Sequence, residues 1–435
     1  MKVFVGGTAV TVTGYSGFPE TNSVPDCCAE PIESVQFTWP AGTAGTSADI
    51  SVSDSAGSAT ATGAAHYLPA VQQFPLPGAA LNQGIYDSLR DVYYFTDQTK
   101  IQIFSRTRGA WLTPITIPSS SRLWGLSLSP DGSKLAISDT GNSNIYLLNP
   151  NTPTAIQTFK LPNLAFDAGS IPGGVAVTDS GIIYYNAFYL YSTGGYSLHK
   201  LDTTTGIVTN YILQAGSLGA DAYVRLLLSN DNARLYANFA GSVFALDTAT
   251  DATFFNTTVI GSDYELALSN NQTSMSATEY LLDTDLNGES YVALNPRETW
   301  NQTYVYGEKM SADGSFLFAP GTNSIDVLDG RLGTLLERIA LPVTLTGNFD
   351  ALASDGRDNV LVGITGQNGD GIAVIDLSSL AEPAPLPYPL AAHTGPARMA
   401  SAIVGRRSSD GKKTSAPVVS HAAPRLFHVM NPHMR

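Results

Sequence analysis

A repeated motif limits the fold of this chain more than any other feature. Apolar runs that end in a polar turn led by Ser or Thr recur as IYDSLRD, LSLSPDGSKL, VAVTDSGII, LLLSNDNARL, LALSNNQTSM, KMSADGSFL and ALASDGRDNV. The turn-leading residues are Ser88, Ser129, Thr178, Ser229, Ser269, Ser311 and Ser354, at successive separations of 41, 49, 51, 40, 42 and 43 residues. This period suits four short strands joined by four turns. Seven copies predict an all-β fold, a seven-bladed β-propeller.

The ends of the repeats predict how the ring closes. Several repeats finish in a short strand with Leu-Pro or Ile-Pro, at 115–118, 159–162 and 339–342. Proline suits an outer strand, because it cannot donate a hydrogen bond to a further neighbour. The last repeat lacks such a strand, whereas residues 71–77, VQQFPLP, precede the first repeat and have the same ending. We expect them to complete the last blade, which removes a free sheet edge.

The combined pattern of apolar run, SPDG turn, IxVxD strand and terminal LP resembles the YVTN/NHL-like propeller repeats of bacterial proteins. The resemblance covers roughly residues 71–380. It implies a fold and not a function, since propellers serve many functions.

Residues 1–70 read differently and show no helical period. The order VFVGGTAVTVTG, then WPAGTAGTSADISVSDSAGSAT, then a closing aromatic at Tyr67 resembles the C-terminal half of an IPT/TIG immunoglobulin-like domain. The first strands of such a domain are missing, so the resemblance implies a partial β-sandwich. An incomplete sandwich leaves an unpaired edge, and we expect this region to be the least stable ordered part.

The two ends of the chain differ in charge. Residues 381–435 carry a net charge of +5, which leaves −19 for residues 1–380. The tail is rich in Pro, Ala, Ser and Arg, so we expect a disordered basic tail. Four of the six His lie there, but positions 393, 421, 428 and 433 match no usual metal-ligand spacing.

Charge and hydropathy restrict the partners. An acidic body disfavours nucleic acid, because binding to nucleic acid requires Lys and Arg to neutralise phosphates. No apolar run is long enough to span a bilayer, and the N-terminus lacks a secretory signal. The first residues already read as a strand, so a start within a longer gene is one interpretation, and the missing signal is then weak evidence for the cytoplasm. We expect an extracellular or cell-envelope location from the resemblance alone.

The body contains few catalytic groups. Between residues 71 and 380 there is one His, His199, and no Cys, so propeller enzymes that bind a metal through several His do not map onto this chain. We interpret His199, within YSLHKLD, as an ordinary strand position. Cys27 and Cys28 are adjacent in a loop and are interpreted as two thiols, with a strained vicinal disulfide or a metal contact as the alternatives.

One segment, DTDLNGES, has the ligand spacing of a calcium loop. The candidate ligands are Asp283, Asp285, Asn287 and Glu289. Against calcium, the twelfth position is Leu294 instead of a bidentate Glu, and Asn287-Gly288 is also a common hairpin turn. A structural calcium and a plain hairpin both stay open, and no other cofactor is indicated.

The strongest ligand-binding candidate comes from the residue four places before each turn-leading residue. The occupants are Gly84, Gly125, Gly174, Arg225, Glu265, Gly307 and Asp350, and one residue earlier lie Gln83, Trp124, Gly173, Val224, Tyr264, Tyr306 and Phe349. Glycine lets inner strands crowd toward the axis, so the charged exceptions should face the mouth of the central channel. The predicted ligand-binding residues are Trp124, Arg225, Tyr264, Glu265, Tyr306, Phe349 and Asp350. In the alternative, Arg225 pairs with Glu265 and the aromatic side chains cover the core.

Two functions are compatible with these features. The first is a non-enzymatic binding or scaffold module of a bacterial secreted or surface protein, with a carbohydrate or peptide at the channel mouth. The second follows from the resemblance, because similar propellers include lactonases and quinoprotein-type dehydrogenase subunits. Glu265 and Asp350 would then act as acid or base, or hold a divalent ion.

Overall fold

The computed structural model describes residues 2–16, 34–37, 40, 47–53, 57–66, 71–162, 171–188, 197–212, 224–239, 242–256, 266–277, 280–286, 288–291, 307–346, 350–355, 360–366, 368–377 and 380. Every long regular element in these residues is a β-strand, as the sequence predicts. No helix among them has the length and apolar character to cross a membrane. Cys27, Cys28, Tyr67 and the predicted disordered tail lie outside the described residues.

The N-terminal region contains two small sheets. In the first, the order is β2-β1-β5-β6. Its strands are β1 (Lys2–Val5), β2 (Thr8–Val10), β5 (Ser47–Ser53) and β6 (Ser58–His66). The second sheet pairs β3 (Val12–Ser16) with β4 (Ser34–Phe37). Val3 and Val5 are both 1% exposed, so alternation along β1 gives this sheet one buried face.

The rest of the described chain consists of antiparallel sheets, each named here by its first strand. The β8 sheet contains β8 (Leu81–Asp87), β9 (Val92–Asp97), β10 (Lys100–Ser105), β11 (Ala110–Trp111) and β12 (Ile115–Thr116). The β13 sheet contains β13 (Leu123–Leu128), β14 (Leu135–Asp139), β15 (Asn144–Leu148) and β16 (Ile156–Lys160). The β17 sheet contains β17 (Ile171–Val177), β18 (Ile182–Phe188), β19 (Ser197–Asp202) and β20 (Ile207–Ile212).

The pattern then repeats with shorter inner strands. The β21 sheet contains β21 (Leu226–Leu228), β22 (Arg234–Phe239), β23 (Ser242–Asp247) and β24 (Thr253–Asn256). The β25 sheet contains β25 (Ala267–Leu268), β26 (Ser274–Ala277), β27 (Tyr280–Asp283) and β28 (Gly288–Tyr291). The β29 sheet contains β29 (Lys309–Met310), β30 (Phe316–Pro320), β31 (Ser324–Asp329) and β32 (Leu335–Ala340).

The last sheet combines strands from the two ends of this region. The β33 sheet contains β33 (Leu352–Ser354), β34 (Val360–Thr365) and β35 (Gly371–Asp376), and its outer strand is β7 (Val71–Pro75). Phe74 lies opposite Ile372 in the register of β7 and β35. The segment that precedes the first repeat therefore pairs with the last repeat, as the sequence analysis expects.

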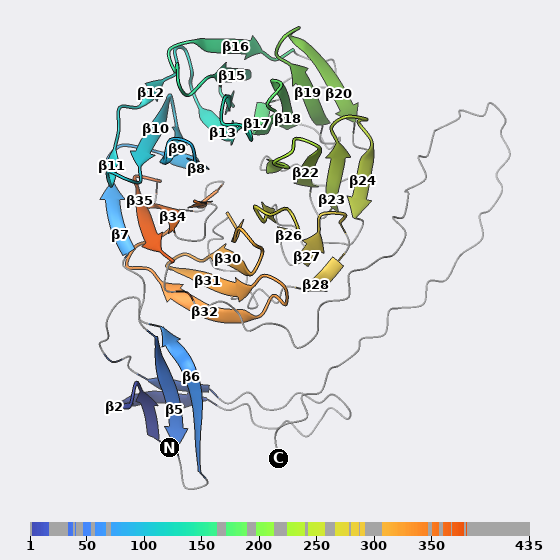
Figure 1. The fold of residues 1–435 in the computed structure, drawn as a ribbon. Coiled ribbons are helices and arrows are strands. Elements are labelled where there is room, and N and C mark those ends of the chain that lie inside the picture. The colour runs from blue at the N-terminus through green and yellow to red at the C-terminus, as the bar shows by residue number, and fades with distance from the viewer. Residues whose placement is uncertain are drawn as a thin grey trace, which may run out of the picture. The chain divides into compact units, whose positions relative to one another are not determined.

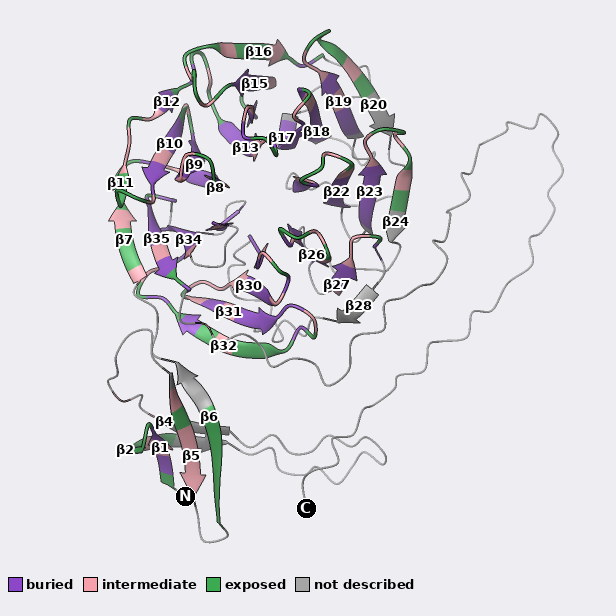
Figure 2. Cartoon of the chain, in the orientation of Figure 1, coloured by how far each residue is buried: buried purple, intermediate pink, exposed green. Residues whose placement is uncertain are grey.

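The sheets form a ring in which neighbours in sequence are neighbours in space (Figure 1). Inner strands contact one another in the order β8, β13, β17 and β21, then β25, β29 and β33, and β33 returns to β8. Residues of the β21 and β25 sheets share a hydrophobic cluster, which joins the two series. The middle strands are mostly buried and the outermost strands mostly exposed (Figure 2). Side chains packed between sheets therefore hold the ring together.

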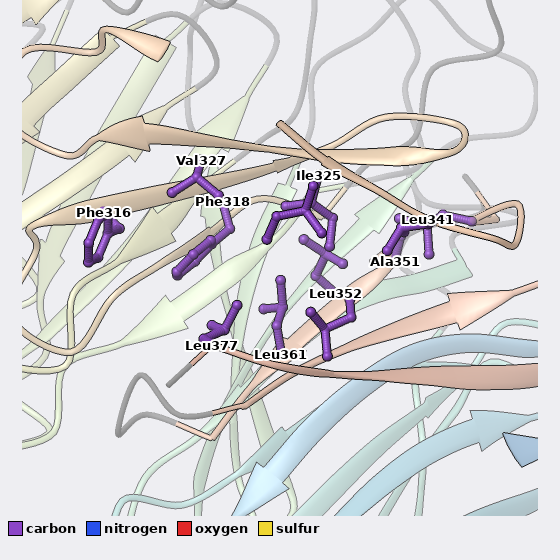
Figure 3. Packing of buried hydrophobic residues seen from close by; sticks show 12 residues of the cluster. Phe316, Phe318, Ile325, Val327, Leu341, Ala351, Leu352, Leu361 and Leu377 are labelled. Carbon is purple, nitrogen blue, oxygen red and sulfur yellow. The ribbon is translucent and has the colours of Figure 1, made fainter. Parts of the chain in front are cut away.

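A hydrophobic cluster lies between each pair of neighbouring sheets. Figure 3 shows the one between the β29 and β33 sheets, where Phe318 and Val327 from one sheet pack near Leu352 and Leu361 from the other. All four side chains are at most 1% exposed. At roughly 25 cal/mol per Å² of apolar area removed from water, these interfaces supply the main driving force for closing the ring.

The turn-leading Ser of the repeat has a structural role that explains its recurrence. The Ser229 hydroxyl donates to Asp231 Oδ1 at 2.6 Å and accepts the backbone N–H of Arg234 at 2.8 Å. Ser129 and Ser311 make the corresponding contacts in their own turns. A hydroxyl can donate and accept at once, so one buried Ser fixes both sides of the turn.

In the first and last repeats the turn-leading position is one residue away from the one expected from the sequence. It is Asp87 instead of Ser88 in the first repeat and Asp355 instead of Ser354 in the last. The N–H of Ser129 bonds to the carbonyl of Lys134, and the equivalent bond in the β33 sheet comes from Asp355, not Ser354. In the β8 sheet the buried position is Asp87, whose Oδ1 accepts the N–H groups of Leu89 and Arg90. A carboxylate accepts backbone N–H groups as a hydroxyl does, so Asp takes the structural place of Ser or Thr in these two turns.

Candidate functional site

Arg225 lies just before β21 and connects several inner strands near the axis of the ring. Its Nη1 donates to the carbonyl oxygens of Leu266 at 2.9 Å and Glu308 at 3.1 Å. Its Nη2 lies 2.5 Å from Oδ1 of Asp350. These acceptors belong to the segments that lead into β25, β29 and β33. The planar guanidinium of Arg225 carries several N–H donors, so this one side chain joins the β21 sheet to the β25, β29 and β33 sheets.

A second cation shares the carboxylate of Asp350. Lys309 Nζ lies 2.9 Å from both oxygens of Asp350. Nearby, the buried Glu308 accepts a hydrogen bond from the Ser276 hydroxyl at 2.8 Å. Burying a charge is costly unless it is paired, and here two cations accompany two carboxylates. The cluster has no net formal charge.

A cavity of about 260 Å³ runs along the inner strands from this charged cluster. It is lined by residues of β8, β21, β25, β29 and β33 and of the segments beside them. Arg225 and Glu308 at one end are buried, whereas Asn230 and Asn270 at the other end are exposed. The cavity therefore extends from the ion cluster toward the turns that follow the inner strands.

The walls between these two ends are mainly aliphatic. The apolar lining residues are Ile85, Leu227, Leu228, Leu266, Ala267, Leu268, Met310 and Ala353. Tyr86 is the aromatic residue of the lining, and its hydroxyl donates to Asp91 Oδ1 at 2.7 Å. Burial, together with that hydrogen bond, raises the pKa of Tyr86. Between the two ends, the described wall residues therefore carry no ionisable group that is charged near neutral pH.

Two glycines mark close approaches between the inner strands of the β13, β17 and β21 sheets. A Cβ on Gly125 would overlap the carbonyl oxygen of Gly173, and a Cβ on Gly174 would overlap that of Val224. The inner strands therefore approach closely at these glycines, as expected where one backbone passes close to another. The sequence analysis predicted this crowding from the glycines themselves.

Polar side chains of second strands link consecutive sheets beside these glycines. Thr96 on β9 donates to the carbonyl of Trp124 at 2.8 Å, and Ser138 on β14 donates to that of Gly173 at 2.6 Å. Ser138 also accepts the N–H of Gly125 at 2.7 Å. Each hydroxyl satisfies a buried backbone group of the next sheet, so these bonds reinforce the radial packing.

The structure places some of the predicted channel-mouth residues and leaves others outside its described part. Arg225 and Asp350 come together at the axis. Trp124 is buried, does not line the cavity and has the Arg122 guanidinium 5.1 Å from its ring centroid. The residues outside the described part are Tyr264, Glu265, Tyr306 and Phe349.

Two of the predicted residues have surroundings that the sequence did not indicate. Arg225 pairs with Asp350, from a sheet that is not a neighbour, and Glu265, its partner in the alternative interpretation, lies outside the described residues. After the one-residue shift of the last repeat, Asp350 aligns with Trp124 and Val224 and not with Arg225. Trp124, which was predicted to bind ligand at the channel mouth, is 6% exposed.

Sequence reasoning missed Glu308 and Lys309. Both lie in the stretch GEKMS, directly after Gly307 and before the turn of the repeat. Adjacent charges in an otherwise apolar inner strand were a usable signal, because such residues are rarely buried unless paired. The repeat alignment sampled only two positions per copy and did not include them.

His199 lies on β19 and is 1% exposed. Its ring stacks on Tyr185 with centroids 4.8 Å apart and planes at 15°. The position is the ordinary strand position that the sequence suggests, and the contact is a packing contact between strands β18 and β19.

The candidate calcium segment connects two paired strands. Strands β27 and β28 pair, with Leu282 opposite Gly288. Asp283 Oδ1 accepts the N–H of Asp285, and the Asp285 carboxylate lies 2.6 Å from Arg234 Nη1 of the β21 sheet. Asn287 and the side chain of Glu289 lie outside the described residues. In the described residues no group of three His, Cys, Asp or Glu is arranged to hold a metal.

Comparisons with known proteins identify the fold. One similar solved structure is the β-propeller domain of Cps50 (Swd1) from Myceliophteria thermophila, with a TM-score of 0.52, 13% identity, and coverage of 70% of this chain and 99% of that chain. Another is hydrazine synthase from Kuenenia stuttgartiensis, with a TM-score of 0.52, 13% identity, and coverage of 70% and 97%. No protein-family model and no curated protein matches the sequence. At this identity the likeness shows the fold alone, and the fold is a β-propeller.

Proposed function

We propose that this chain is a non-enzymatic recognition module built on a seven-bladed β-propeller, with its ligand site in the central channel. In this proposal residues 71–380 form a propeller of the YVTN/NHL-like type and residues 1–70 a partial IPT/TIG-like spacer. Residues 381–435 form a basic tail. The number seven is supported because each copy of the sequence repeat supplies one of the sheets that surround the axis.

The observation that carries the proposal is the cavity along the inner strands. Binding sites are concave, mostly apolar and accompanied by a few polar groups, and this cavity has aliphatic walls with polar groups at both ends. We propose the same ligand class that the sequence indicates, a carbohydrate or a peptide. We now place the proposed site in the cavity beyond Arg225 and not at the predicted mouth residues.

The geometry gives the enzyme alternative little support. Asp350 would have to act as an acid, a base or an ion ligand, but both of its oxygens already contact Lys309 and one also contacts Arg225. Both oxygens of this carboxylate are therefore already occupied, and Glu265, the other candidate, lies outside the described residues. We therefore favour recognition over catalysis. An exported or cell-envelope location is proposed from the resemblance of the repeats.

The test compares a cavity-filling variant with a matched control. Leu228 lines the cavity and Leu128 occupies the same place in the β13 sheet without lining it, each one residue before the turn-leading Ser. The full chain, Leu228→Trp and Leu128→Trp are screened on a glycan array and against a displayed peptide library. We expect ligands that bind the full chain and Leu128→Trp but not Leu228→Trp. Ligands that bind all three equally would place recognition elsewhere on the chain.

A further inference from the structure

The charged end of the cavity disfavours an ionic ligand. Arg225 and Lys309 are offset by Asp350, and the buried Glu308 brings the formal charge of the cluster to zero. A charged ligand group would lose its hydration on entering, and the described residues of the cluster carry no excess charge of opposite sign to compensate. The group that enters the cavity should therefore be uncharged.

The walls favour an aliphatic group over a sugar ring. Leu228, Leu268 and Met310 line the cavity, and Tyr86 supplies its one aromatic side chain among the described residues. The volume of about 260 Å³ is below the roughly 300–1,000 Å³ typical of sites for whole small molecules. The space therefore suits one side chain or a group of similar size.

The exposed end offers groups that match a peptide backbone. Asn230 Nδ2 donates to the carbonyl and to Oδ1 of Asn270, at 2.9 and 3.1 Å. Both residues are exposed and both line the cavity. An amide side chain has two donor hydrogens and an acceptor oxygen with two lone pairs, which are the groups that bind the N–H and C=O of a peptide backbone.

We infer that the cavity receives an uncharged aliphatic side chain, of the size of Leu or Met, carried by a peptide that enters past Asn230 and Asn270. This inference rests on the proposed function and specifies its ligand class. The inserted side chain packs against Leu228, Leu268 and Met310, while the ion cluster forms the end of the site. The burial of apolar area provides the affinity and the paired charges provide selection against ionic side chains.

Methyl NMR of the full chain tests the inference directly. The sequence has six Met, of which Met310 lines the cavity and Met275 is fully buried outside its lining. A sample with ¹³C-labelled Met methyl groups is titrated with N-acetyl-leucine amide and N-acetyl-methionine amide. The comparison probes are N-acetyl-aspartate amide, N-acetyl-lysine amide and methyl glucoside. We expect saturable shifts of Met310, and not of Met275, with the two aliphatic amides alone.

Variants connect the shift to the cavity. Leu228→Trp should weaken the response of Met310 at least tenfold, and Leu128→Trp should leave it unchanged. Ser354→Leu, which fills the same cavity from β33, serves as a second filling variant, and the Met275 resonance reports whether each variant is folded. Persistence of the response in both filled variants would contradict the inference.

Failure of the inference can be told apart from failure of the proposed function. If Met310 responds to the sugar or to charged amides instead, the cavity is a binding site for another class and only the inference is wrong. If no probe shifts the Met310 resonance, and the array ligands bind Leu228→Trp as well as they bind the full chain, both the inference and the proposed function are wrong.

Discussion

Arg225 and Asp350 form a buried ion pair, Nη2 to Oδ1 at 2.5 Å, although the β25 and β29 sheets separate their own sheets in the ring. The two side chains are 5% and 2% exposed. A contact of this kind requires the four consecutive sheets that begin with β21, β25, β29 and β33 to curve around a common axis. The pair therefore reports on that curvature as well as contributing to it.

Removing one member of this pair should be costly. Asp350→Asn leaves Arg225 and Lys309 without their shared carboxylate, and breaking a buried pair costs about 3–5 kcal/mol. Asp251→Asn, at the more exposed Lys200–Asp251 pair, should cost at most about 1 kcal/mol. Urea unfolding of both variants measures the difference, and equal costs would show that the axial pair adds no special stability.

Gly174 tests the crowding of inner strands. A Cβ there meets the carbonyl oxygen of Val224, and backbone in a closed ring has little room to move. We expect Gly174→Ala to cost about 3 kcal/mol or to prevent folding. Gly206→Ala is the control, because its φ of 71° is strained for alanine but nothing lies within 4 Å of its Cβ. Thermal unfolding should show a loss of about 1–2 kcal/mol for that control.

Phe74 tests ring closure through β7. Its ring lies 4.7 Å from that of Phe104, between the β33 and β8 sheets. Phe74→Ala should destabilise the chain by about 2–3 kcal/mol, because the ring is partly buried. Gln73→Ala, exposed on the same strand, should change stability by less than about 0.5 kcal/mol. Matching urea midpoints for the two variants would show that the Phe74 ring does not stabilise the closed ring.

Asp131 makes one turn sensitive to acid. Burial acts to raise the pKa of Asp131, but hydrogen bonds from Ser129 and Ser133 outweigh it and lower the pKa to about 2. A carboxyl with a depressed folded pKa stabilises the fold above its unfolded pKa, near 3.8, and this stabilisation is lost as the pH falls toward 2. Ser129→Ala should therefore be less stable than the unaltered chain at pH 6. The difference between their free energies of unfolding, measured with urea, should become smaller between pH 4 and pH 2.

The acid prediction has a control in the β8 sheet. Ser88 is exposed in the corresponding turn, where Asp87 occupies the buried position. Ser88→Ala should shift the urea midpoint little at either pH. The stability difference between Ser129→Ala and the unaltered chain could also stay constant from pH 6 to pH 2. That result would exclude Asp131 as the source of the difference.

The hairpin interpretation of residues 283–289 also makes a prediction. Arg234 already occupies the Asp285 carboxylate, so a cation would have to displace a guanidinium. We expect millimolar calcium to leave the melting temperature unchanged relative to EDTA. A rise that disappears in Asp283→Asn would instead establish the calcium site.

The fold could be predicted because the repeat encodes it locally. Ser229 and Ser311 hold their turns through contacts within a few residues, so the turns recur as a pattern that can be read in the sequence. The same reading erred at Asp87 and Asp355, where a carboxylate replaces the hydroxyl.

The site was harder to predict because its contacts are long-range. Arg225 was identified as a charged exception among glycines, but its partner depends on how far the side chain reaches across the axis. Glu308 and Lys309 were missed because their partners, Ser276 and Asp350, belong to other sheets. A repeat alignment compares equivalent positions and does not reveal pairs between non-equivalent ones.

The composition of the β33 sheet has a consequence for synthesis of the chain. Strand β7 leaves the ribosome before any other strand of the ring, yet its partner β35 is the last of them to be made. During elongation β7 therefore stays without its partner β35 while the intervening sheets form. The ring is completed only after translation has passed Asp376.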